Sequence, residues 1–175
     1  MTPEQQLLSQ AAKTAFRLNG QFYDIGEHLS RPTGLTAATW QVLGAVLSEP
    51  MPVAGIARAV GITRQSVQRT ADILVQQGLA EYVPNPAHQR AKLLRPTGEG
   101  REAVARIAPA HAAFAYLLAE ELGVDELRSI LEKLTLLSEA LSNVAPEGLK
   151  VSIAEATSGV RPGALAGTAL QSHRR

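Results

Sequence analysis

The sequence contains no cysteine, which excludes a disulfide framework, a metal site built on thiolates and a redox switch that uses a protein thiol. It also lacks long apolar runs, because charged residues interrupt them well short of the roughly 20 residues that span a bilayer. No secretory signal is recognisable in the sequence. We therefore expect a cytoplasmic protein with no part in a membrane.

The motifs that mark common catalytic sites are missing as well. There is no nucleophile elbow, no glycine loop of the kind that cradles phosphate and no pair of carboxylates in an evident cleft. The four histidines are too scattered along the chain to suggest a metal site. The sequence therefore predicts that the protein is not an enzyme and has no metal or cofactor.

What the sequence does contain is enough apolar material for a core and an uneven distribution of charge. Its 175 residues are 45% hydrophobic, which predicts a globular domain with or without a tail. The net charge is +1, yet residues 51–100 hold six basic against three acidic side chains, and residues 101–145 hold four against seven. A basic segment beside an acidic one suits a protein that presents one face to DNA, and the modest excess favours binding in two copies.

Residues 52–78 have the pattern of a helix-turn-helix. The first helix begins at Pro52, and its apolar residues recur in steps of three and four: Val53, Ile56, Ala57 and Val60. Gly61 supplies the positive φ that a short turn needs, and Ile62 is expected to fill the angle between the two helices. Thr63 is expected to cap the second helix with its hydroxyl.

The second helix begins near Arg64 and is expected to stop at Gly78. Its predicted buried face consists of Val67, Thr70, Ala71 and Leu74. Its opposite face carries polar side chains in the first two turns: Arg64, Gln65, Ser66, Gln68 and Arg69. An arginine fork matches guanine O6 and N7, and a glutamine amide matches adenine N6 and N7, so this face suits base reading. The alternative is a helical hairpin within a core, with a solvated polar face.

A β-hairpin is predicted directly after this helix, over residues 79–96. Two short strand-like runs flank a loop rich in Pro, Asn, His, Gln and Arg. A hairpin that follows a recognition helix is a wing, and it favours nucleic-acid binding over the plain hairpin. We count Thr63, just before the recognition helix, and Lys92, within the hairpin, with the DNA-binding surface.

Long helices with heptad-like apolar seams flank the central unit. Residues 3–30 form the first, with Leu8, Ala11, Ala15, Leu18, Phe22, Ile25 and Leu29 on one stripe. A helix capped by Thr97 should run to about residue 121, with a kink or else a break at Pro109. The last helix begins at Asp125, with Leu127, Ile130, Leu134, Leu137 and Leu141 on one stripe. The seams predict dimerisation of residues 5–30 with 100–145, although a long core helix within one subunit is the alternative for the first.

Two further residues stand out. Thr36 should cap a helix that carries Trp40, Leu43 and Leu47 inward and ends at Pro50. Trp40 reads as a core anchor rather than a stacking platform for a ligand. His111 falls on an apolar seam, where packing is commoner than ligand binding.

From residue 146 to 175 the composition turns small and polar without periodicity, which predicts a flexible tail after a domain of residues 1–145.

The order helix, helix, helix-turn-helix, wing, long helix, long helix resembles the MarR family of bacterial transcription regulators. The matching segments are residues 35–43, 56–63, 74–79 and the wing at 85–90, which runs on to 97–100. Arg90 matches the family's tip arginine, which enters the minor groove. His88 stands where the family has an acid, Gln89 where it has an arginine, and Pro96 where it has leucine, so the wing departs from the family pattern.

The resemblance implies a mainly α fold with a small β-wing, flanked by terminal dimerisation helices. It also implies a homodimer that binds a pseudo-palindromic operator on double-stranded DNA, usually as a repressor, and is released by a small, often phenolic or aromatic-acid effector. Four residues are expected to line an effector pocket: Phe16, Tyr23, Trp40 and His111. The alternatives are a constitutive DNA-binding protein without an effector and a winged helix used for protein contact. The sequence does not identify the operator, the regulated genes, the effector or the sign of regulation.

Overall fold

The structure is a computed structural model that describes residues 1–88 and 90–144. These residues fall into two compact units, Met1–Tyr116 and a second unit from Leu117 onward. The predicted tail, residues 146–175, lies outside the described residues. Among the described residues, no helix has the length and apolar character needed to cross a membrane.

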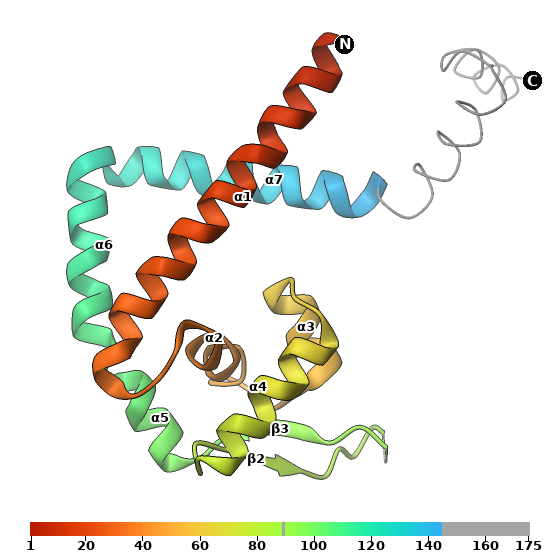
Figure 1. Ribbon diagram of the computed structural model, residues 1–175, viewed down its shortest axis with the longest axis vertical. Helices are drawn as coiled ribbons and strands as arrows, with labels where there is room; N and C mark the ends of the chain where they lie inside the picture. Colours follow the sequence, from red (N-terminus) through yellow and green to blue (C-terminus); the bar gives the residue numbers. More distant parts are fainter. Residues whose placement is uncertain (89, 145–175) are drawn as a thin grey trace, which may run out of the picture. The chain divides into compact units, whose positions relative to one another are not determined.

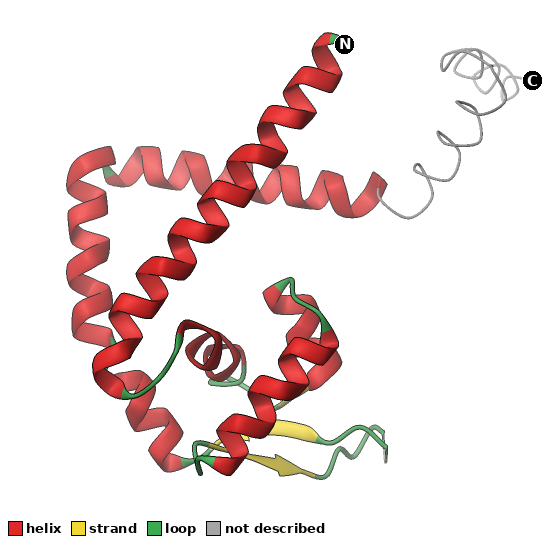
Figure 2. Cartoon of the chain, viewed as in Figure 1, coloured by secondary structure: helices red, strands yellow, loops and turns green. Residues whose placement is uncertain are grey.

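The first unit contains seven helical segments and three short strands, confined to one side of the helices (Figures 1 and 2). In chain order they are α1 (Pro3–Ser30), η1 (Arg31–Thr33), α2 (Ala37–Ala45), β1 (Met51–Pro52), α3 (Val53–Val60), α4 (Arg64–Gln76), β2 (Ala80–Val83), β3 (Leu93–Pro96), α5 (Gly98–Ala105) and the first part of α6 (Ala108–Leu122). The predicted mainly α fold with a small β-wing is confirmed.

One apolar core holds the central helices and the wing together. Its largest fully buried side chains come from α2, α3, α4, β3 and the residue pair between α5 and α6: Leu43, Ile56, Leu74, Leu94 and Ile107. Burial of each such side chain contributes about 1.5–3 kcal/mol. The core therefore fixes α4 and the wing against each other, which is what positions the polar side chains discussed below.

The helix-turn-helix has the predicted boundaries. Gly61 ends α3 with φ 76°, and Gly78, just beyond α4, has φ 74°. The Thr63 hydroxyl accepts a hydrogen bond from the Ser66 backbone N–H at 3.1 Å, so it caps α4 as predicted. The role given to Ile62 is wrong, because this side chain is 37% exposed and does not fill the angle between the helices.

The helix before this motif is shorter than predicted. Thr36 caps α2, but the helix ends at Ala45 rather than at Pro50. Backbone bonds from Val46 to Leu43 and from Leu47 to Gly44 span three residues and tighten its last turn. The segment after the helix includes β1 (Met51–Pro52), a strand that the sequence pattern did not predict.

The three strands pair antiparallel in the order β1-β3-β2. Tyr82 lies opposite Leu94, and Glu81 lies opposite Arg95, whose Nε donates to Glu81 Oε1 at 2.9 Å. Pro96 pairs with Ala80 at the end of the ladder, a position that tolerates the missing N–H.

A close contact joins the wing to α5. The Thr97 backbone N–H donates to the Leu79 carbonyl at 3.1 Å, and its hydroxyl donates to the Gly78 carbonyl at 2.7 Å. Gly100 lies so close to the Leu79 carbonyl oxygen that any Cβ there would overlap it. These contacts therefore hold the segment from Thr97 to Gly100 against the base of the wing.

The predicted helix from Thr97 to about residue 121 is two helices. It breaks at residues 106–107, between α5 and α6, just before Pro109. Proline has no N–H to offer the preceding turn and its ring clashes with that turn, so the break falls where a kink or a break was expected. In the second unit, α7 (Val124–Val144) follows Gly123 at φ 83°, close to the predicted start at Asp125.

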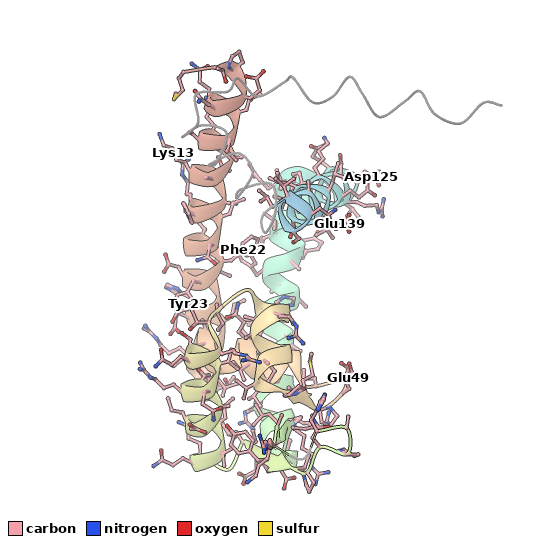
Figure 3. All side chains as sticks on the ribbon, turned by 90° about the vertical axis from the view of Figure 1, so that its right-hand side faces the viewer. Lys13, Phe22, Tyr23, Glu49, Asp125 and Glu139 are labelled. Carbon is pink, nitrogen blue, oxygen red and sulfur yellow. The ribbon has the colours of Figure 1, made fainter. Side chains whose placement is uncertain are left out.

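The buried residues of α1, Gly26 and Ser30, lie near its C-terminal end. Glu27 Oε1 accepts from the Ala37 backbone N–H at 2.7 Å, which ties α1 to the first turn of α2. Earlier in α1 the predicted seam is largely open, with Leu8 62% and Phe22 61% exposed. Figure 3 shows Phe22 and Tyr23 projecting from this helix.

Candidate nucleic-acid interface

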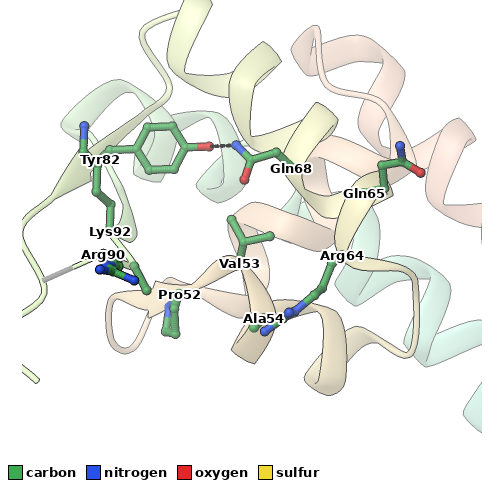
Figure 4. Close-up of a pocket in the computed structure, with 10 residues that line it drawn as sticks. Pro52, Val53, Ala54, Arg64, Gln65, Gln68, Tyr82, Arg90 and Lys92 are labelled. Carbon is green, nitrogen blue, oxygen red and sulfur yellow. Dashed lines mark hydrogen bonds between the residues drawn. The ribbon is translucent and has the colours of Figure 1, made fainter. Parts of the chain in front are cut away.

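A groove of about 710 Å³ lies between the N-terminal half of α4, the start of α3 and the wing (Figure 4). Its lining comprises Pro52, Val53, Ala54, Arg64, Gln65, Gln68, Tyr82, Arg90, Ala91 and Lys92. Three of these ten are basic and none is acidic. The groove therefore joins polar and cationic groups of the recognition helix to those of the wing.

Five of the eight residues predicted to bind DNA meet in this groove: Arg64, Gln65, Gln68, Arg90 and Lys92. All five side chains are exposed. The other three, Thr63, Ser66 and Arg69, are exposed but do not line it. The Thr63 and Ser66 hydroxyls lie 2.9 Å apart in a hydrogen bond, so both serve the helix cap.

Sequence reasoning missed two residues that hold Gln68. Gln68 Nε2 donates to Asp72 Oδ1 at 2.9 Å and to Tyr82 Oη at 2.8 Å, while Tyr82 Oη donates to Asp72 Oδ1 at 2.8 Å. Burial, followed by the hydrogen bond to Asp72 and its negative charge, raises the pKa of Tyr82 to about 12. The four-residue spacing of Gln68 and Asp72 was visible in the sequence, but Tyr82 enters only through the strand register.

The wing tip is shaped by its own turn. Asn85 Oδ1 accepts from the Ala87 backbone N–H at 3.0 Å, and the Asn85 carbonyl accepts from the His88 N–H at 3.2 Å. The His88 carbonyl in turn accepts from the Ala91 N–H at 3.1 Å. This turn returns the chain so that Arg90 lines the groove.

A second cavity, of about 590 Å³, adjoins the other side of the recognition helix. It is lined by Asn19, Phe22, Tyr23, Gly26, Ala37, Ala38, Trp40, Gln41, Gly44, Val60, Gly61, Ile62, Ser66 and Thr70. Of the four residues expected in an effector pocket, Tyr23 and Trp40 line it. Phe16 and His111 do not, and Phe16 is 78% exposed.

His111 instead packs against the tryptophan. The ring centroids of Trp40 and His111 lie 5.8 Å apart with an interplanar angle of 84°, an edge-to-face contact. Trp40 is half-buried and packs against the core of α2 and α4. It therefore both anchors the core, as the sequence suggested, and forms part of the cavity wall.

The arrangement of α2, α3 and α4 with an antiparallel three-stranded sheet defines a winged helix-turn-helix protein. Residues 33–91 match the family model described as "MarR family". This match takes in α2, α3, α4 and β2.

Known proteins are similar to this chain in sequence or in fold. The uncharacterized protein Rv2011c of Mycobacterium tuberculosis is 41% identical over 92 residues, 53% of this chain and 64% of the relative. The chain thus matches less than two thirds of that relative's length. The structure of the transcriptional repressor CouR bound to a 23-mer DNA duplex is 25% identical, with TM-score 0.65, and covers 79% of this chain and 99% of its own. The structure of the PcaV regulator from Streptomyces coelicolor with its natural ligand is 23% identical, with TM-score 0.62, and covers 77% and 95%.

Proposed function

We propose that the protein is a DNA-binding transcription regulator that acts in the cytoplasm and places α4 in the major groove. The observation that carries this proposal is the groove in which Arg64, Gln65 and Gln68 of α4 face Arg90 and Lys92 of the wing. Arginine and glutamine at the start of a recognition helix reach base edges, while wing cations contact the backbone or the minor groove. The likeness to a repressor solved with a DNA duplex supports DNA binding.

Homodimerisation belongs to this proposal because each flanking helix has apolar side chains that its own unit leaves exposed. The predicted seam of α7 has Leu134 42%, Leu137 39% and Leu141 51% exposed, and α1 exposes Leu8 and Phe22. Exposed apolar stripes of this length mark association surfaces. Two copies would place two α4 helices on half-sites about one helical turn apart, roughly 10 base pairs, on a pseudo-palindromic operator.

The dimer is tested by sedimentation at micromolar concentration. The wild type should sediment as a dimer, and Leu18→Glu combined with Leu137→Glu should give a monomeric or unfolded species, since both leucines belong to the predicted seams. A folded wild-type monomer at that concentration would refute the dimer.

An effector-released repressor is the form of regulation we propose. The 590 Å³ cavity touches α1 and α2 on one side and Ser66 and Thr70 of α4 on the other, so an occupant would contact the recognition helix directly. No residue in the lining carries a formal charge, whereas hydroxyl and amide groups come from Tyr23 and Gln41. That chemistry favours a neutral phenolic compound over an aromatic carboxylate. A neighbouring fold solved with its natural ligand supports a small-molecule role.

DNA binding is tested by selecting duplexes from a random library and measuring affinity by fluorescence anisotropy on selected and scrambled duplexes. Arg64→Ala should lose about 1–3 kcal/mol per half-site on the selected duplex and relax one base position, whereas Arg69→Ala should weaken both duplexes nearly alike. Arg128→Ala is the matched control, because it removes the same charge from α7, where Arg128 pairs with Asp125. Failure of the wild type to prefer any duplex would reject the proposal.

The effector is tested by thermal shift and by release from the selected duplex with neutral phenols and with the corresponding carboxylates. Stabilisation by phenols, lost in Trp40→Ala but kept in Phe16→Ala, would support the cavity as the site. If no compound stabilises the protein while specific DNA binding persists, the protein is a constitutive binder.

A further inference from the structure

The side chain of Gln68 presents only one of its two polar atoms to the groove. Its nitrogen, Tyr82 Oη and Asp72 Oδ1 form a nearly equilateral triangle with edges of 2.8, 2.8 and 2.9 Å. Figure 4 shows the amide nitrogen facing the Tyr82 hydroxyl and the amide oxygen turned into the groove. The nitrogen therefore donates its hydrogen bonds within the protein, and the oxygen can accept a hydrogen bond from a ligand.

The chemistry of the three partners fixes this orientation. A carboxylate only accepts hydrogen bonds, so the Tyr82 hydroxyl must donate to Asp72 and is left with acceptor capacity. The raised pKa of Tyr82 keeps its proton in place at neutral pH. Only the NH₂ of Gln68 can donate to both oxygens, because a flipped amide would set its oxygen against the Asp72 carboxylate. The amide is held by hydrogen bonds and not by packing, since Gln68 and Asp72 are exposed.

We propose that Gln68 reads DNA as an acceptor only, selecting an exocyclic amino group in the major groove, and that Asp72 and Tyr82 are positioning residues for this reading. The inference rests on the proposed DNA-binding function. The usual glutamine contact to adenine is bidentate: Oε1 accepts from N6–H and Nε2 donates to N7. With Nε2 held by Asp72 and Tyr82, the N7 half of that contact is unavailable. The amino group is adenine N6 in an A·T pair and cytosine N4 in a G·C pair.

The experiment starts from the duplex selected by the wild type and finds the base pair whose preference disappears in Gln68→Ala. At that pair one analogue removes the amino group: purine for adenine, or pyrimidin-2-one for cytosine. A second analogue removes only N7: 7-deazaadenine or 7-deazaguanine. The identity of the pair tells which base supplies the amino group. We expect the first analogue to lower affinity roughly threefold to tenfold per half-site, and the second to change it less than twofold.

A release variant provides a readout that structural damage would not imitate. Asp72→Ala combined with Tyr82→Phe frees the amide, so an adenine contact should become bidentate and 7-deazaadenine should become unfavourable. The combined Glu81→Ala and Arg95→Ala variant is the control, because it removes a polar pair between β2 and β3 and leaves Gln68 held. Circular dichroism checks that both variants are folded.

Three outcomes would overturn the inference while leaving DNA binding intact. They are a loss on 7-deaza substitution as large as the loss on amino removal in the wild type, no base pair that depends on Gln68, and, where that pair is A·T, no new sensitivity to N7 in a folded release variant. If the wild type selects no duplex at all, the proposed function itself fails.

Discussion

The salt dependence of operator binding follows from the cations that the fold presents together. Arg64, Arg69, Arg90 and Lys92 are exposed on α4 and the wing. Arg95 is excluded, because its guanidinium pairs with Glu81 across the strands. Four cations per protomer should neutralise about eight phosphate charges in a dimer, so log K against log salt should have a slope near −7. Between 50 and 200 mM salt the affinity should therefore fall on the order of 10⁴-fold.

Single substitutions measure how much each residue contributes to this slope. Arg90→Ala removes one contact per subunit and should flatten the slope by about two units per dimer if the wing contacts phosphate. Arg128→Ala removes the same charge from α7 and should leave the slope unchanged. The assay is an anisotropy titration on the selected duplex at four or more salt concentrations. A slope flatter than about −3 for an intact dimer, or equal flattening by both variants, would refute the reasoning.

Three further predictions concern stability and titration. Gly100→Ala should lower the free energy of unfolding by about 1–3 kcal/mol in thermal melts, because its Cβ overlaps the Leu79 carbonyl oxygen, whereas Gly98→Ala, which meets open space, should not. Ser30→Ala should raise the free energy of unfolding by about 1 kcal/mol, because the buried Ser30 hydroxyl oxygen has no hydrogen-bond partner among the described residues. An unchanged or lower melting temperature would contradict this. An ultraviolet difference titration of wild type against Tyr82→Phe should show the Tyr82 phenolate forming near pH 12. Since this pKa is raised on folding, the associated stability is complete below about pH 10 and is lost as the pH rises towards 12.

Local signals in the sequence were enough to place the recognition helix. A capping hydroxyl and a left-handed glycine act within a few residues of the helix end they define, so Thr63 and Gly78 could be assigned without knowledge of the rest of the fold. The same locality explains the success at α1 and α7, whose apolar periodicity extends over many turns. In each case the evidence lies within the element itself.

Features that depend on partners distant in the sequence were not predicted. β1 consists of two residues that are extended because they pair with β3, some 40 residues later. Tyr82 reaches Gln68 and Asp72 only because the strand register turns it towards α4. Ile62 is predicted to fill the angle between the two helices, yet it lies exposed beside a cavity. None of these positions carries a local signal of its environment.

The effector pocket shows the same division between local and distant information. Tyr23 and Trp40 were chosen because they are aromatic, and both line the cavity. Phe16 lies two helical turns before Tyr23 on α1, where its side chain is exposed. His111 packs against Trp40 outside the cavity. Aromatic character thus identifies candidates, but only packing decides which of them enclose a space.

Helix α4 lies between both proposed sites, and this placement constrains how they can communicate. Ser66 and Thr70 face the cavity, while Arg64 and Gln68 face the groove, one turn or less away along the same helix. A rigid helix that moves to admit an effector must therefore move its groove side chains as well. If binding is coupled in this way, linkage requires reciprocity: an effector that weakens operator affinity tenfold must itself bind tenfold more weakly to the operator complex. An effector affinity that is the same on free and operator-bound protein would show that the cavity does not control the groove.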